Sequence, residues 1–178
     1  TGSIGKTTFD IFKKNQNDFE IILLTTNKNV KILLKQAYLF NVKNLIITDR
    51  KKFLETKKKL SNRKINLFNN FDDLDKILKN KIDYTMSSIS GLNGLIPTMR
   101  IIKFTKNIAI ANKESIICAW NLIKVELVKR KTNFIPVDSE HFSIWSILDR
   151  TPKYKIDEIT ITASGGPFLN FPLNKFNK

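Results

Sequence analysis

A regular alternation of short apolar runs with runs of helical length constrains this chain more than any other feature. The apolar runs have the length of buried strands, and we expect strands at residues 19–26, 45–48, 64–68, 82–88, 107–111 and 133–137. Helical patterns lie between them, at residues 6–15, 30–40, 51–60, 71–78, 95–104 and 114–130. Strands that alternate with helices are joined by right-handed crossovers into a mainly parallel sheet. The pattern therefore predicts an α/β fold.

The character of the chain changes near residue 138. Residues 141–148 are apolar and typical of a helix, residues 156–163 alternate like a strand, and the remainder has no period. We therefore predict one domain at residues 1–137 and the beginning of a second at residues 138–178.

The number of cysteines indicates the redox environment in which the chain works. Cys118 is the only cysteine among 178 residues, so no internal disulfide is possible. A reducing, cytoplasmic compartment is the simpler expectation, and a plastid-type organelle is the alternative. Cys118 lies in an apolar helical run, where a packed core thiol is the expected role. No run is long and apolar enough to cross a membrane.

The net charge of +15 raises an alternative function. A basic balance of this size favours nucleic acid or an anionic ligand as partner. The basic residues are mostly lysines scattered along the chain, and lysine, asparagine, isoleucine and phenylalanine are abundant together, as in AT-rich coding. A basic nucleic-acid-binding module is thus an alternative, although we expect no nucleic-acid partner.

Two acidic residues stand together after the last predicted strand of the first domain. Asp138 and Glu140 flank Ser139, and His141 follows. In an extended segment, residues i and i+2 face the same side, so both carboxylates could aim at one point. Carboxylate oxygens suit Mg²⁺ or Mn²⁺. The alternative is a strand exit with two solvated acids. We expect His141 to be packed or to support the pair rather than to bind metal.

The first residues are typical of a phosphate-binding turn. Gly2 and Gly5 precede a helix whose N–H groups could face a phosphate, although a plain helix-entry turn has the same pattern. One helix later, the strand at residues 19–26 ends in Asn27-Lys28-Asn29. In a Rossmann-type domain an acid at this point favours NAD, and a basic residue favours NADP. The absence of an acid predicts NADP, unless Lys28 is an ordinary surface lysine.

A third cluster, Ala111-Asn112-Lys113-Glu114-Ser115, joins the clearest strand to the clearest helix. Asn112 has the character of a helix cap, and Glu114 favours the positive end of the helix dipole. Lys113 is a cation at that same end, and a bound anion would account for it.

These clusters, with Gly91, Gly94-Leu95-Ile96-Pro97-Thr98 and Ser164-Gly165-Gly166-Pro167-Phe168, occur in one order along the chain. The ordered set resembles the 1-deoxy-D-xylulose 5-phosphate reductoisomerase family. The resemblance implies a Rossmann-like NADP-binding domain followed by the start of an α+β catalytic domain. It implies an NADPH- and divalent-metal-dependent enzyme that rearranges and reduces a sugar phosphate to 2-C-methyl-D-erythritol 4-phosphate. Another Rossmann oxidoreductase would share the glycine turn but not the later motifs.

The resemblance also implies roles for single residues. Cofactor contacts are implied at Thr1, Gly2, Ser3, Ile4, Asn27, Lys28, Asn29, Asn112 and Glu114. The family usually has glycine where Asn27 stands. Catalytic roles are implied at Lys113, Asp138 and Glu140, of which Asp138 and Glu140 would be metal ligands. Substrate contacts are implied at Lys113, Ser139, Glu140 and Ser164.

The same resemblance bears on completeness and assembly. The family's first strand, third metal ligand, lid and C-terminal half have no counterpart in this chain, so we expect the isolated chain to be inactive. The family is typically dimeric, and we expect a homodimer for the full-length protein.

Overall fold

A computed structural model describes residues 1–60, 64–161 and 172 of the chain. It has two compact units, Thr1–Val137 and Asp138–Lys178. The strands are β1 (Leu23–Thr26), β2 (Asn44–Ile47), β3 (Asn66–Phe68), β4 (Ile82–Ser87), β5 (Thr105–Ile110) and β6 (Asn133–Pro136). The helices are α1 (Ser3–Lys14), α2 (Val30–Leu39), α3 (Arg50–Lys59), α4 (Leu74–Ile77), α5 (Leu95–Ile101), α6 (Lys113–Arg130) and α7 (Ser139–Leu148). Short 3-10 helices cover Gln16–Asp18, Leu92–Gly94, Ile102–Phe104 and Lys153–Lys155.

All paired strands of the first unit run parallel, in two three-stranded sheets. The orders are β1-β2-β3 and β4-β5-β6, so each strand pairs with the next one along the chain. Helices α2, α3 and α6 each connect two neighbouring strands, and α5 connects β4 to β5. The predicted α/β fold with parallel pairing is confirmed.

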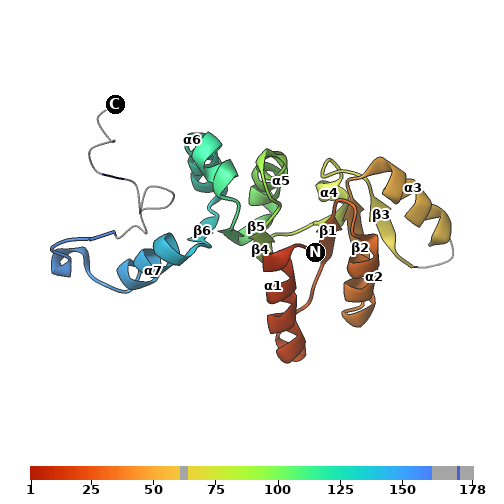
Figure 1. The fold of residues 1–178 in the computed structure, drawn as a ribbon, viewed down its shortest axis with the longest axis horizontal. Coiled ribbons are helices and arrows are strands. Elements are labelled where there is room, and N and C mark those ends of the chain that lie inside the picture. The colour runs from red at the N-terminus through yellow and green to blue at the C-terminus, as the bar shows by residue number, and fades with distance from the viewer. Residues whose placement is uncertain (61–63, 162–171, 173–178) are drawn as a thin grey trace. The chain divides into compact units, whose positions relative to one another are not determined.

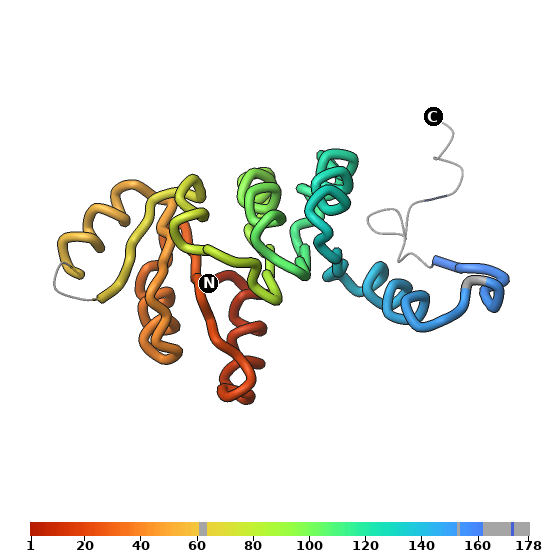
Figure 2. The backbone as a smooth tube through the Cα atoms, turned by 180° about the vertical axis from the view of Figure 1, so that it is seen from behind, coloured from red at the N-terminus to blue at the C-terminus, as the bar shows by residue number. Residues whose placement is uncertain are grey.

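Helices cover both sides of this strand layer. Helices α1 and α2 lie on one side, and α5 and α6 lie on the other (Figure 1). The view from behind has the same arrangement (Figure 2). Parallel strands covered on both faces are apolar throughout, which explains why Leu45, Ile46 and Ile47 of β2 are all fully buried.

The core of the first unit consists of two apolar clusters. One lies around Leu33, Leu45 and Ile47 and joins α2 to the first sheet. The other lies around Ile108, Ile110 and Ile123 and includes Ile46 of β2. Neighbouring residues of β2 therefore point into different clusters, and Ile46 ties the first sheet to the core of the second.

Asparagine side chains join the strands at their amino-terminal ends. In the first sheet Asn66 Nδ2 donates to Asn44 Oδ1 at 2.9 Å, and Asn44 Nδ2 donates to the carbonyl of Ile22 at 3.1 Å. In the second sheet Asn133 Nδ2 donates to Asn107 Oδ1 at 3.0 Å, and Asn107 Nδ2 donates to the carbonyl of Asp83 at 2.8 Å. The register pairs Asn44 with Asn66 and Asn107 with Asn133, so these side chains form one asparagine ladder in each sheet, and each ladder has a link on both sides of its central strand.

Several elements differ from those expected. Helix α4 is a single turn rather than eight residues, because Asn70 Oδ1 accepts from the Asp72 amide and holds the preceding residues in a turn. Residues 156–161 form no strand, and none of the described strands pairs with them. Helix α6 contains a non-helical residue, Ala119 (φ −143°, ψ 28°).

Several apolar side chains of α6 are exposed. Ile117, Leu122, Val125 and Val128 are 64–81% exposed. Cys118 lies on the same helix and is exposed, so the expectation of a core thiol is wrong. None of the helices in the described part of the chain is long and apolar enough to cross a membrane.

Candidate functional site

A cavity of about 300 Å³ lies at the carboxyl-terminal ends of β4 and β5 in the first unit. Its lining comes from three segments: the start of α1, the residues after β4 and the start of α6. The lining residues are Ile4, Ser88, Ile89, Ser90, Ala111, Asn112, Lys113 and Glu114. Ligands of open α/β sheets bind at this end of the strands. Four residues that the sequence predicted to bind cofactor or substrate, Ile4 and residues 112–114, therefore share one cavity.

The turn before α1 lies between this cavity and the end of β1. Thr1 Oγ1 is 2.9 Å from Thr26 Oγ1, the last residue of β1, whereas Ile4 lines the cavity. Gly2 is the N-cap of α1 and provides no side-chain cap. A Cβ added at Gly2 or Gly5 would have no atom within 4 Å, so no protein group fills the space beside either glycine. This turn can accommodate a ligand beside its backbone.

The residues after β1 do not line the cavity. Asn27, Lys28 and Asn29 are exposed. Asn27 Nδ2 donates to Thr48 Oγ1 at 2.9 Å, and Asn29 Oδ1 accepts from the Ile32 amide as the N-cap of α2. Asn27 thus joins the ends of β1 and β2, while Asn29 has a structural role in its helix. Lys28 adds a positive charge at this strand end.

The start of α6 supplies the charged wall of the cavity. Asn112 is buried and accepts from the Ser115 amide as N-cap, which confirms its predicted capping. Lys113 and Glu114 are exposed in the first turn. Glu114 is favourable at the positive end of the helix dipole, and Lys113 is not. An anion in the cavity would be attracted by Lys113 and by the positive end of the α6 helix dipole.

Sequence reasoning missed the residues that follow β4. Ser88, Ile89 and Ser90 line the cavity. They precede Gly91, whose φ of +69° lies in a region that only glycine adopts without strain. A polar stretch directly after a buried strand and before such a glycine was the available signal.

The carboxylate pair belongs to the second unit and has a different geometry from the one predicted. Asp138 is the N-cap of α7, and Glu140 lies in the first turn of that helix. The expectation of two carboxylates on one face of an extended strand is therefore wrong. Asp138 Oδ1 accepts from the His141 amide at 2.6 Å, because an acidic cap stabilises the start of this apolar helix.

His141 is neither packed nor buried. Its side chain is 71% exposed, and Nδ1 lies 2.9 Å from both carboxylate oxygens of Asp138. The expectation of a packed histidine is therefore wrong. A histidine in this position can orient the carboxylate of Asp138, and its supporting role stays a prediction.

The oxygen donors fit a hard divalent cation by type. Asp138, Ser139 and Glu140 offer carboxylate and hydroxyl oxygens within the first turn of α7. Across residues 1–60, 64–161 and 172, no three acidic, histidine or cysteine side chains gather as a metal site. Ser164, the other predicted substrate contact, lies outside the described residues.

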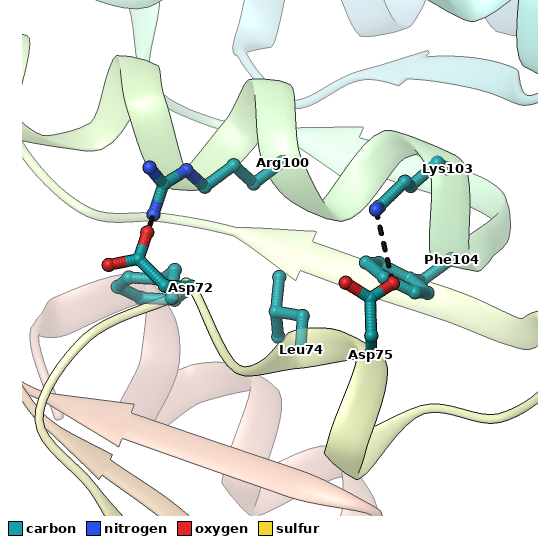
Figure 3. Close-up of a pocket in the computed structure, with 7 residues that line it drawn as sticks. Asp72, Leu74, Asp75, Arg100, Lys103 and Phe104 are labelled. Carbon is teal, nitrogen blue, oxygen red and sulfur yellow. Dashed lines mark hydrogen bonds and ion pairs between the residues drawn. The ribbon is translucent and has the colours of Figure 1, made fainter.

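A second cavity, of about 240 Å³, lies where two segments of the first unit pack together. Phe71, Leu74 and Phe104 form its apolar part. Its charged residues pair with one another across it: Arg100 with Asp72, and Lys103 with Asp75 at 3.1 Å (Figure 3). Since both pairs join the segment around α4 to the segment around α5, this cavity is a packing seam between them.

Family models match nearly the whole chain. A model described as 1-deoxy-D-xylulose 5-phosphate reductoisomerase matches residues 1–120. The chain belongs to the 1-deoxy-D-xylulose 5-phosphate reductoisomerase family. A model described as the C-terminal domain of the reductoisomerase matches residues 134–178. The resemblance drawn from the ordered motifs is confirmed.

Individual reductoisomerases agree with this assignment. The enzyme of Pelagibacter ubique is 62% identical over 178 residues, which is 99% of this chain and 46% of that protein. The solved reductoisomerase of Zymomonas mobilis, in complex with NADPH, is 35% identical with a TM-score of 0.82, covering 98% of this chain and 46% of that one. A structure with NADPH, fosmidomycin and magnesium is 27% identical with a TM-score of 0.81, covering 98% and 46%. The chain thus spans about half the length of the reductoisomerases it matches.

Proposed function

We propose that this chain is the cofactor-binding part, and the beginning of the catalytic part, of an NADPH- and divalent-metal-dependent 1-deoxy-D-xylulose 5-phosphate reductoisomerase. The single observation that carries the proposal is the cavity that Ile4 and residues 112–114 line together, in a chain of this family. The reaction would isomerise 1-deoxy-D-xylulose 5-phosphate and reduce the product to 2-C-methyl-D-erythritol 4-phosphate.

The cofactor would lie along the carboxyl-terminal ends of the strands. The backbone of residues 1–4 would approach the pyrophosphate, since the two glycines leave the space beside the turn empty. Lys28 would attract the 2′-phosphate that distinguishes NADPH from NADH, because residues 27–29 include no acid. Asn112 and Glu114 are proposed to contribute to the cofactor site from α6. NADPH supplies the hydride when it is bound.

Lys113 is proposed to bind the substrate at the cavity. Its ammonium group would hold negative charge that develops on substrate oxygen, because a fixed cation in a partly closed site stabilises such charge strongly. Its place in the first turn of α6 adds its charge to the positive end of the helix dipole. Both features favour an anionic substrate.

Asp138 and Glu140 are proposed to hold Mg²⁺ or Mn²⁺. A divalent cation between these oxygens would polarise a substrate carbonyl as a Lewis acid. The contact of His141 Nδ1 with Asp138 would fix the orientation of that carboxylate. Ser139 and Ser164 are proposed to contact the substrate.

The setting of the full-length protein follows from the same proposal. We propose a small sugar phosphate as the partner molecule, a cytoplasmic location and a homodimer. The function does not require a nucleic acid, and the net positive charge of the chain would favour anionic small molecules.

The test of the cofactor assignment compares NADPH with NADH. Replacing Lys28 by alanine should weaken NADPH binding about tenfold and leave NADH binding unchanged, because only NADPH carries the 2′-phosphate. Lys35→Ala is the matched control, since Lys35 is also exposed and lies on α2, away from the strand end. Titration followed by cofactor fluorescence measures both dissociation constants.

Circular dichroism must accompany the titration. A chain that has its helices but ignores NADPH would refute the cofactor proposal. If that chain bound DNA with an affinity that falls steeply with salt, the nucleic-acid alternative would replace it.

A further inference from the structure

Asn112 uses every N–H of its side chain inside the protein. Its Nδ2 donates to the carbonyl of Ile89 and, at 2.8 Å, to the carbonyl of Gly91, while its Oδ1 accepts from the Ser115 amide at 2.6 Å. These partners fix the orientation of the amide, because carbonyls only accept and a backbone N–H only donates. The residue is 3% exposed. Its side chain therefore has no N–H left for a ligand.

The partners of Asn112 belong to two of the segments that form the walls of the cavity. Ile89 and Gly91 lie in the segment after β4, of which residues 88–90 line the cavity. Ser115 lies in the first turn of α6, where Lys113 and Glu114 line it. One buried side chain thus holds the two walls against each other.

Gly94 leaves space for this contact because it has no Cβ. A Cβ added at Gly94 would overlap both Asn112 Nδ2 and the carbonyl of Ile89. Thr98 Oγ1 donates to the carbonyl of Gly94 at 2.7 Å and is 2.6 Å from Ser87 Oγ. Because Thr98 is fully buried, these hydrogen bonds hold the segment after β4 in place from the interior of the protein.

We infer that Asn112 is a positioning residue, which sets the shape of the cofactor cavity by holding residues 89–91 against the first turn of α6. The inference rests on the proposed cofactor function of that cavity. It goes beyond the capping role, because capping needs only Oδ1 and the contact between the walls needs only Nδ2.

Asn112→Asp separates these two roles. A carboxylate still accepts from the Ser115 amide, but it donates nothing and faces two carbonyl oxygens. Helix content should therefore persist, while the dissociation constant for NADP⁺ measured by calorimetry rises about tenfold.

A pH series distinguishes positioning from general damage. A buried carboxylate that faces carbonyl oxygens is protonated more readily, and its acid form can donate to one of them. The ratio of variant to wild-type dissociation constants for NADP⁺ should therefore fall as pH is lowered from about 8 to about 5.5. Lys113, Glu114 and the phosphates of NADP⁺ are the charged groups beside this position, and they are present in both proteins.

Thr132→Val is the matched control. Thr132 is also buried, and its hydroxyl lies 2.9 Å from two backbone carbonyls, those of Ile102 and Thr105, near the amino-terminal end of β5. Its loss should lower the thermal midpoint without changing NADP⁺ affinity. Amide exchange of residues 88–94 should accelerate in Asn112→Asp and stay at the wild-type rate in Thr132→Val.

Gly94→Ala perturbs the same contact from the other side. Its effect on NADP⁺ affinity should not add to that of Asn112→Asp, because residues in direct contact are coupled. Full additivity would contradict the inference, as would equal exchange of residues 88–94 in Asn112→Asp and Thr132→Val. If the wild-type chain failed to bind NADP⁺ while Asn112→Asp still accelerated exchange, the wall contact would stand and the proposed function would fail.

Discussion

The two sheets of the first unit have similar side-chain contacts at the amino-terminal ends of their strands and different ones at the carboxyl-terminal ends. Both have an asparagine ladder at the amino-terminal ends of their strands. At the carboxyl-terminal ends, the first sheet carries the exposed contact between Asn27 and Thr48, whereas the second has the buried network of Asn112 and Thr98. The ladder end serves the strands alone in both sheets. The carboxyl-terminal end is exposed and polar in the first sheet, whereas buried hydrogen bonds fix its conformation in the second sheet.

The largest effect should come from β2, where the two cores meet. Ile46→Ala and Leu45→Ala should each lower the free energy of unfolding by about 2–5 kcal/mol, since both side chains are fully buried. Only Ile46 belongs to the core of the second sheet, so amide exchange in β5 should accelerate in Ile46→Ala and not in Leu45→Ala. Equal exchange in both variants would show that the clusters are not separate.

The second-largest effect should appear when the free energies of unfolding are compared for substitutions at the carboxyl-terminal strand ends of the two sheets. Thr98→Val should cost about 1–3 kcal/mol, because it leaves the carbonyl of Gly94 and the hydroxyl of Ser87 without their buried partner. Thr48→Val should cost less than about 0.5 kcal/mol, since Thr48 is exposed and water replaces the contact with Asn27. Urea denaturation measures both, and similar costs would contradict the contrast.

The third effect tests the shared ladders. Asn44→Ala and Asn107→Ala should each cost about 1 kcal/mol, because each removes two cross-strand hydrogen bonds of partly exposed groups. Neither should change the affinity for NADPH. A loss of affinity in either variant would mean that this end of the sheets is coupled to the cavity.

The smallest effect concerns Asp83 at the ladder end of β4. The hydrogen bond and charge of Lys106, 2.8 Å away, lower the pKa of this carboxyl. A lowered pKa stabilises the fold above the ordinary value of about 3.9, and the gain disappears as pH falls through the folded value. Asp83→Asn should melt slightly below the wild type at neutral pH. The two melting temperatures should converge in acid, and a constant difference would assign the effect to something other than ionisation.

The strands could be predicted because a strand that is buried on both faces consists of consecutive apolar residues. Leu45, Ile46 and Ile47 are apolar in succession, as only a doubly covered strand requires. Helix α6 was equally clear from its length. Helix α4 was overestimated, because the turn that Asn70 makes with Asp72 competes with helix in a way that apolar spacing does not record.

The site was partly predictable for the same reason. Polar residues directly after apolar strands marked Asn112 and Lys113. The carbonyls that accept from Asn112 Nδ2 lie 23 and 21 residues earlier, on another loop, so no local pattern could identify these two hydrogen bonds. Asp138 was assigned to an extended strand although it precedes an apolar helical run, where an acidic cap is the ordinary choice.

Parallel pairing also bears on how this unit folds. Among the described strands of this unit, none of the pairs can form as a local hairpin, since partners such as Leu23 and Asn44 are separated along the chain by a whole helix. The entropy of closing that loop is lost before the first ladder bond forms. We therefore expect the earliest productive nucleus to be a strand-helix-strand unit, such as β5, α6 and β6, and refolding to be slower than that of a helical bundle of similar size.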